Sequence, residues 1–241
     1  MPHPPRASRA YRNIARVVRP FLRAVSRRDW RGAEHLPAGG GYLVAVNHVT
    51  NLDPLTFAHF MYDHDVAPRF LAKDSLFRVP VLGPVLLGTG QIPVARGTAA
   101  AGRSLEPAAA ALAAGEVVAV FPEGTLTRDP DLWPMVGKTG AARLALTTGV
   151  PVIPVAQWGA HRILGRYSKV LKPLPRKLVT VVAGPPIDLS DLMPAPGASP
   201  DAAALRAATT RIMGTITAML EEIRGERAPA PFDPRAGEGT R

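Results

Sequence analysis

The sequence predicts an α/β domain whose mainly parallel or mixed sheet is covered by helices on both faces. Two observations support this prediction. Short, uniformly apolar runs that suit buried strands alternate along the chain with segments that suit helices. The length of 241 residues and the apolar content of 46% also suffice for a single domain with a large core and a small appendage.

The elements of the main domain follow from apolar runs that end at Gly, Pro or polar turn residues. Strands are expected at residues 42–46, 69–73, 91–94, 117–121, 150–155 and 177–183. Helices are expected at residues 55–62, 104–114, 139–149 and 202–224. Residues 76–90 mix large apolar side chains with Gly and Pro, which favours an irregular apolar loop.

Residues 9–30 have a different pattern, with arginines at steps of three or four residues. On one helix these arginines lie within about an 80° arc, and apolar residues occupy the opposite side. The arginines are Arg12, Arg16, Arg19, Arg23 and Arg27, and the apolar residues are Ile14, Val17, Val18, Phe21, Leu22 and Val25. Such a helix suits a lipid interface, and it equally suits packing on the main domain. Pro20 is expected to bend the segment or divide it into two short helices.

The chain is therefore expected to have three parts. Residues 1–31 form a basic amphipathic, membrane-associating helical segment, and residues 32–224 form the main domain. Residues 225–241 are rich in Pro and Gly and are expected to be a disordered tail.

The charge balance points to a polyanionic partner. The chain has 29 Lys and Arg against 19 Asp and Glu, a net charge of +10, and only five of the basic residues are Lys. Arginine binds phosphate bidentately, so an anionic membrane, a nucleic acid or a phosphate-bearing substrate fits this balance. The absence of cysteine excludes disulfides, thiolate metal sites and a cysteine nucleophile. No apolar run reaches the roughly 18–20 residues that cross a bilayer, so any attachment is expected to be peripheral.

His48 and Asp53 carry the first chemical signal, directly after the strand expected at 42–46. A neutral imidazole is the usual general base near pH 7, and its second nitrogen needs an acceptor that fixes the tautomer. A carboxylate five residues later reaches that nitrogen if a turn begins at the histidine. A helix-capping aspartate beside a structural histidine explains the same spacing. This motif alone therefore does not distinguish a catalytic pair from a structural one.

Three further blocks also lie at strand ends. They are Ile92–Pro93–Val94–Ala95–Arg96–Gly97, Phe121–Pro122–Glu123–Gly124–Thr125 and Val150–Pro151–Val152–Ile153–Pro154–Val155. Each one alone is common strand-and-turn punctuation.

In this order the four blocks resemble the PlsC-like glycerolipid acyltransferases, the lysophosphatidic acid (1-acyl-sn-glycerol-3-phosphate) and glycerol-3-phosphate acyltransferase family. The resemblance covers about residues 40–160. Asn47, His48 and Asp53 match N-H-x4-D, residues 121–125 match F-P-E-G-T in full, residues 150–155 match a V-P-I-I-P-V-like strand, and Arg96 and Gly97 match an Arg-Gly turn with Lys73 as the basic residue upstream.

Two positions depart from the family pattern. Thr50 stands where Ser is common, which keeps the hydroxyl. Leu126 stands where many members have Arg, so one phosphate contact is lost or is taken over by Arg128.

The resemblance implies transfer of a fatty acyl group from acyl-CoA or acyl carrier protein to the free hydroxyl of 1-acyl-glycerol 3-phosphate, giving phosphatidic acid. His48 is then the general base and Asp53 orients it. Arg96 is expected to bind the acceptor phosphate, with Lys73 and Arg128 as weaker candidates. Glu123, Gly124 and Thr125 are expected to shape the glycerol site, and residues 76–87 are a candidate wall of an acyl tunnel.

The expected partners are an anionic membrane surface, a lysophospholipid acceptor and the acyl donor, at the cytoplasmic face of the cell membrane. No metal or redox cofactor is implied, and His59 and His64 are expected at a solvent-exposed helix end. Low aromatic content and the lack of a recognisable module disfavour a nucleic-acid partner. Two alternatives remain: an acyltransferase for glycerol 3-phosphate, another lysophospholipid or a glycolipid, and a non-enzymatic basic protein that binds membranes or nucleic acid.

Overall fold

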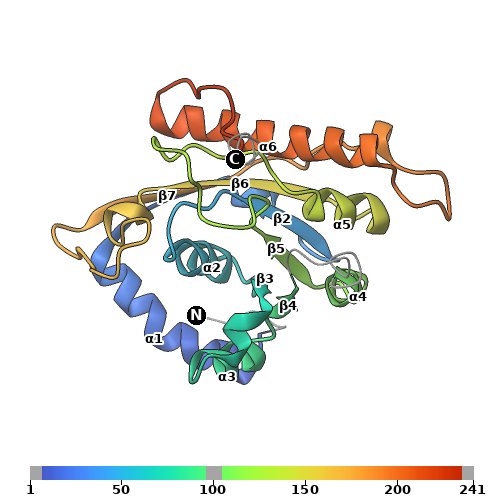
Figure 1. Ribbon diagram of the computed structural model, residues 1–241. Coiled ribbons are helices and arrows are strands. Elements are labelled where there is room, and N and C mark those ends of the chain that lie inside the picture. The colour runs from blue at the N-terminus through green and yellow to red at the C-terminus, as the bar shows by residue number, and fades with distance from the viewer. Residues whose placement is uncertain (1–6, 96–104, 235–241) are drawn as a thin grey trace, which may run out of the picture.

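Seven strands form one mixed sheet in the order β1-β7-β6-β2-β5-β3-β4 in the computed structural model, which describes residues 7–95 and 105–234 (Figure 1). The strands are β1 (Ser26–Arg31), β2 (Tyr42–Val46), β3 (Arg69–Lys73), β4 (Ile92–Val94), β5 (Val117–Val120), β6 (Val152–Trp158) and β7 (Lys177–Ala183). Neighbouring strands run parallel except β6 and β7, which are antiparallel. The predicted α/β class with a mixed sheet is confirmed.

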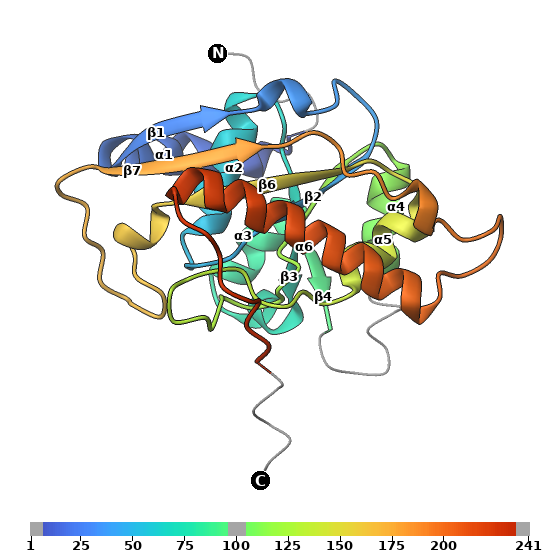
Figure 2. The same cartoon turned by 90° about the horizontal axis from the view of Figure 1, so that it is seen from above.

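Helices cover both faces of this sheet (Figures 1 and 2). The helices are α1 (Arg9–Val25), α2 (Asp53–Asp63), α3 (Leu82–Gly88), α4 (Glu106–Ala113), α5 (Gly140–Thr148) and α6 (Ala202–Arg224). Side chains of α4, α5 and α6 pack in the core on one face, and side chains of α1 and α2 pack in the core on the other. The short helix α3 lies beside α1.

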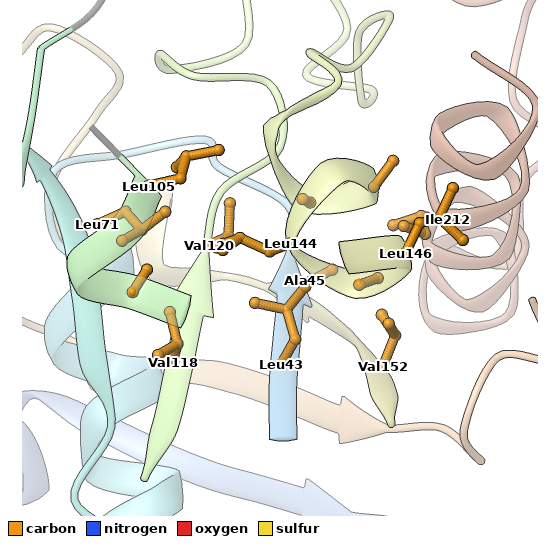
Figure 3. Packing of buried hydrophobic residues seen from close by; sticks show 14 of the residues in the cluster. Leu43, Ala45, Leu71, Leu105, Val118, Val120, Leu144, Leu146, Val152 and Ile212 are labelled. Carbon is orange, nitrogen blue, oxygen red and sulfur yellow. The ribbon is translucent and has the colours of Figure 1, made fainter. Parts of the chain in front are cut away.

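Burial on both faces explains why the central strands read as continuous apolar runs. Successive side chains of a strand point to opposite faces, so every position of a doubly covered strand is buried. In β2, Leu43 and Ala45 belong to the core under α5 and α6, whereas Val44 and Val46 belong to the core over α2. Figure 3 shows the first of these cores, with Leu43, Ala45, Val118, Val120 and Val152 of the sheet beside Leu144 and Leu146 of α5 and Ile212 of α6.

Two elements differ from the sequence prediction. Residues 26–31, expected to belong mostly to the N-terminal helical segment, form edge strand β1, which pairs with β7 from Ser26↔Lys177 to Arg31↔Val182. Four of its six residues are charged, which is tolerated at an edge and hides the strand from an apolar pattern. Residues 76–90 are not an irregular loop, because they contain the end of a 3₁₀ helix (Asp74–Arg78) and α3. Pro84 lies in the first turn of α3, where proline is compatible with a helix.

The N-terminal helix α1 buries part of its apolar side against the domain, which a helix lying in lipid would not do. Pro20 lies inside it without dividing it. Leu22 is fully buried in the core, so its predicted contact with membrane is wrong. Arg19 and Arg23, also predicted to face lipid, form ion pairs with Asp63 at the end of α2. Predicted membrane contacts of Arg12, Arg16 and Phe21 stay predictions, and Phe21 is exposed.

Asp63 is the centre of this docking contact. Besides Arg19 and Arg23, the Arg28 guanidinium at the start of the sheet donates to its Oδ2 at 3.0 Å. His59 lies one helical turn before Asp63 and packs edge-on against Trp30 with 4.7 Å between ring centroids. His59 is buried, so the prediction of a solvent-exposed helix end is wrong for this residue.

Residues 225–234, expected to begin a disordered tail, contact the segment between β5 and α5. Phe232 forms a bridge with Met135, and its carbonyl accepts from the Val136 N–H. Residues 235–241 lie outside the described part of the chain.

Gly32, in the turn after β1, provides a test of the pairing between β1 and β7, which the sequence did not predict. Gly32 has a φ of 77°, and a Cβ at this position would lie 1.8 Å from the carbonyl oxygen of Ala183 at the end of β7. We predict that Gly32→Ala lowers the free energy of unfolding by about 2–4 kcal/mol in urea titrations, because the edge strand must move.

Gly40→Ala is the matched control, since Gly40 has a similar φ of 80° and a Cβ at that position would have no atom of the described residues within 4 Å. Equal stability of the two variants would mean that the chain does not pass this close to β7.

Candidate active site

One carboxylate oxygen organises the turn after β2. Oδ2 of Asp53 accepts from His48 Nδ1 at 3.1 Å, from the Val49 N–H at 2.5 Å and from the Thr50 N–H at 2.8 Å. Asp53 is buried and is the first residue of α2, where the positive end of the helix favours a carboxylate. Because Oδ2 accepts, Nδ1 carries the proton of the neutral imidazole, and Nε2 is left as a base. The predicted proximity of His48 and Asp53 is confirmed.

The imidazole of His48 lies in the wall of a cavity. Its ring stacks on Phe121 with 4.0 Å between centroids and an interplanar angle of 22°. The side chain is 15% exposed, so it is held on one side and reachable on the other. A ring fixed in this way is oriented before any substrate arrives.

The F-P-E-G-T block holds the backbone of this histidine. Oε1 of Glu123 accepts from the His48 N–H at 2.9 Å, and Oε2 accepts from the Met135 N–H at 3.1 Å. The Thr127 N–H donates to the His48 carbonyl at 2.7 Å. Glu123 is buried with both oxygens engaged, so it positions His48, which differs from the predicted role in a glycerol site. Gly124 and Thr125 do line the cavity.

Gln157, which was missed from the sequence, ties three elements together behind the turn. It exchanges hydrogen bonds with Asn47: its N–H donates to Asn47 Oδ1 at 2.8 Å, and its carbonyl accepts from Asn47 Nδ2 at 3.0 Å. Its side-chain amide donates to the Asn47 carbonyl and accepts from the Thr56 hydroxyl of α2. The sequence contained one signal for this role, which is a single glutamine near the end of the otherwise mostly apolar strand β6.

The cavity beside His48 has a volume of about 650 Å³ and mainly apolar walls. Its walls come from α1, α2, β3 and the segment that contains α3. Leu76, Leu82, Val85 and Leu86 belong to the wall, as does Lys73 at the end of β3. Residues 76–87 therefore border a cavity as predicted. Leu126, which stands where the family pattern has Arg, is buried and also lines it.

A second cavity of about 310 Å³ shares Leu71, Phe121 and Gly124 with the first. Among the described residues, its cationic lining comes from Lys138 and Arg143, just before and within α5. The Lys138 N–H donates to the Pro122 carbonyl at 2.8 Å. Gly124 has a φ of 74°, and a Cβ there would lie 3.0 Å from the Lys138 ammonium nitrogen. Glycine at 124 thus leaves the space that the Lys138 side chain occupies between the two cavities.

The structure places one of the two remaining predicted phosphate contacts, Arg128, and does not describe the other, Arg96. Arg96 and Gly97 follow β4 and lie outside the described residues. Arg128 is exposed and lines neither cavity, although its backbone N–H contacts the Met135 sulfur. Lys138 was missed because its place in the sequence indicates only the start of a helix.

The chain is similar to proteins of known families. A family model described as acyltransferase matches residues 27–158, more than half of the chain. The 1-acyl-sn-glycerol-3-phosphate acyltransferase of Borreliella burgdorferi is 34% identical over 137 residues, 54% of this chain and 50% of the relative. The enzyme of the same name from Salmonella typhimurium is 32% identical over 155 residues, 63% of this chain and 59% of the relative. The chain thus spans between half and three-fifths of these relatives.

A solved structure shares the fold. The crystal structure of the 1-acyl-sn-glycerophosphate (LPA) acyltransferase PlsC from Thermotoga maritima superposes with a TM-score of 0.61. The match covers 90% of this chain and 85% of that chain at 22% identity.

The buried carboxyl of Glu123 gives a prediction about pH. Burial raises the pKa of Glu123 from 4.5 to about 8. The hydrogen bonds from the two backbone N–H groups lower this pKa, but their effect is smaller than that of burial. Between these two pH values the folded chain retains a proton that the unfolded chain has lost, so stability falls as pH rises. We predict that wild type loses stability relative to Glu123→Gln across this window, by up to about 1.4 kcal/mol per pH unit.

Urea titrations of both proteins at a series of pH values measure this difference. A wild-type advantage that grows with pH would contradict the raised pKa and would mean that the fold prefers the ionised carboxylate.

Proposed function

Because this chain belongs to the acyltransferase family, we propose that it transfers a fatty acyl group from acyl-CoA or acyl carrier protein to the free hydroxyl of 1-acyl-glycerol 3-phosphate, giving phosphatidic acid. The observation that carries the proposal is the Asp53-oriented imidazole of His48 in the wall of an apolar cavity. The names of the relatives from two bacteria support the acceptor.

In the proposed reaction Nε2 of His48 removes the proton of the acceptor hydroxyl as its oxygen attacks the thioester carbonyl carbon. The tetrahedral intermediate then collapses with cleavage of the carbon–sulfur bond. The departing thiolate takes the proton from the imidazolium, which restores neutral His48 and releases a thiol. Asp53 stabilises the imidazolium through Nδ1–H, and general-base assistance of this kind contributes about 10²–10⁴-fold in rate.

The larger cavity is proposed to hold the acyl chain of the donor. Its mainly apolar walls favour a hydrocarbon, and its volume falls within the roughly 300–1,000 Å³ of small-molecule sites. His48 and Thr125 also line this cavity, which supports a position of the thioester beside the imidazole.

The smaller cavity is proposed to hold the phosphate of the acceptor. Lys138 and Arg143 supply positive charge beside Gly124, which borders both cavities. With Leu126 apolar and Arg128 outside the lining, Lys138 is the cation that replaces the Arg of the family pattern. Arg96 remains proposed for the same phosphate, and Lys73 is proposed to add positive charge from the larger cavity.

Attachment to the membrane is proposed to be peripheral, at the cytoplasmic face. Among the helices within residues 7–95 and 105–234, none combines the length and apolarity needed to cross a bilayer. Large apolar side chains are exposed at Val79, Val81 and Leu87, close to the α3 wall of the larger cavity. These side chains bring the cavity close to the lipids that the reaction needs.

A different acceptor is the second candidate, favoured by Leu126 in place of Arg. Glycerol 3-phosphate, another lysophospholipid or a glycolipid would use the same His48 and Asp53 chemistry. A panel of acceptors with a radiolabelled acyl donor separates these possibilities, because the preferred acceptor has the highest kcat/KM.

We predict that His48→Ala lowers acyl transfer to lysophosphatidate by about 10²–10⁴-fold, because the base is removed. The measurement is thin-layer separation of labelled phosphatidic acid formed from acyl-CoA. His64→Gln is the control, since His64 lines neither cavity and should retain activity. Undiminished transfer by a folded His48→Ala protein would end the general-base proposal.

We predict that Lys138→Gln lowers kcat/KM for lysophosphatidate roughly 10- to 100-fold, because a charge-assisted contact to phosphate is lost. Transfer to the neutral acceptor monoacylglycerol should change little. Gly124→Ala should have a similar effect by displacing the ammonium, and the double variant should be no worse than the more impaired single one.

Arg206→Gln on the exposed face of α6 is the charge-matched control. Equal losses with both acceptors, or additive effects of the two substitutions, would remove Lys138 from the phosphate site.

A further inference from the structure

Residues 162–177, from the end of the 3₁₀ helix Ala160–Arg162 to the start of β7, expose apolar and basic side chains together. Its large apolar residues Tyr167, Val170 and Leu174 are 64%, 67% and 75% exposed, and Leu171 is exposed as well. Its basic residues are Arg162, Arg166, Lys169, Lys172, Arg176 and Lys177, and no Asp or Glu occurs from residue 132 to residue 187. We infer that residues 162–177, called here the basic loop, are a membrane-contact surface for an anionic bilayer, which rests on the proposed reaction at a lipid surface.

The basic loop is an ordered projection with internal hydrogen bonds. Leu164 and Leu171 form an antiparallel bridge, and the Lys172 N–H donates to the Ile163 carbonyl at 2.7 Å. At its tip the Ser168 N–H donates to the Gly165 carbonyl, and the Ser168 hydroxyl accepts from the Val170 N–H. Backbone groups bonded within the loop have less need of water, so the tip can enter the headgroup region at lower cost.

The loop is attached to the N-terminal helix. The Arg176 guanidinium donates to the carbonyls of Arg23 and Ser26 at 2.8 and 2.7 Å, where α1 ends and β1 begins. In both views the segment projects from the end of the molecule at which α1 meets β1 (Figures 1 and 2). The exposed Phe21 of α1 lies four residues before the end of this helix. The loop therefore adds to whatever contact α1 makes with lipid.

The loop is also attached to the proposed catalytic blocks. The Thr50 hydroxyl donates to the Leu164 carbonyl at 2.5 Å, beside the turn of His48 and Asp53. Arg166 donates to the carbonyls of Thr127 and Asp129 at 3.0 and 2.5 Å, directly after the F-P-E-G-T block. Because the loop is hydrogen-bonded to residues beside the site, its contact with the bilayer sets the distance between His48 and the membrane surface.

The chemistry of the loop selects an anionic bilayer as the partner. Lysine and arginine near an anionic surface are attracted to it, and exposed Val and Leu gain free energy by entering the lipid interface. Nucleic acid accounts for the cations alone and leaves three exposed aliphatic side chains unused. Tyrosine at the tip suits the boundary between headgroups and hydrocarbon.

Flotation of the full chain tests this inference, with vesicles of phosphatidylcholine alone or mixed with phosphatidylglycerol. Wild type should bind the mixed vesicles more tightly. The double variant Val170→Ser/Leu174→Ser should lower the partition coefficient roughly tenfold or more, through lost apolar burial. Lys169→Gln/Lys172→Gln should lower it roughly tenfold on mixed vesicles and hardly at all on phosphatidylcholine.

The control Met193→Ser/Arg206→Gln removes one exposed apolar and one exposed basic side chain elsewhere and should float like wild type. Both loop variants should keep acyl transfer to lysophosphatidate dispersed in detergent, which separates loss of attachment from misfolding. Loop variants that float like wild type would overturn the inference, even if a protein partner then proved to bind the loop. An inactive wild type that still floats would overturn the proposed function and leave the contact surface standing.

Discussion

The site depends on one buried oxygen atom. Oδ2 of Asp53 accepts three hydrogen bonds, and these close the turn between β2 and α2 while fixing the imidazole of His48. A buried carboxylate is stable only with such partners, so the turn, the start of α2 and the tautomer of His48 depend on one another. Glu123 and Thr127 hold the histidine backbone from the other side, and Gln157 fixes the strand behind it.

Parallel strands explain why blocks far apart in the sequence meet at this turn. β2 pairs with β5 on one side and with β6 on the other, and both pairs are parallel. The carboxyl ends of these strands therefore lie at one edge of the sheet, where α/β folds commonly bind ligands. The conspicuous F-P-E-G-T block acts there largely through backbone contacts, which leaves the cavity to Gly124 and Thr125 and brings in Lys138 from α5.

The sequence was sufficient to predict the bounds of elements that have one dominant pattern. The strand at 42–46 has the predicted bounds because every one of its positions is apolar and buried. The strands at 69–73 and 177–183, which also contain charged or polar residues, and the helix at 202–224 have the predicted bounds as well. β1 was missed because its charged residues continue the helical spacing of arginines in α1. Leu22 and Arg19 were assigned to lipid because periodicity gives a face without saying what covers it. Gln157 and Lys138 act through contacts with residues distant in sequence or in another element, which no local pattern encodes.

The tautomer of His48 tests the central claim most directly. Nitrogen-15 NMR of the labelled chain, with the His48 signals assigned by substitution, reports which ring nitrogen carries the proton of the neutral imidazole. The hydrogen bond to Asp53 requires protonated Nδ1 and unprotonated Nε2, and Asp53→Asn should shift the Nδ1 signal most. A neutral ring protonated at Nε2, or spectra unchanged by Asp53→Asn, would contradict the assignment of His48 as the oriented base.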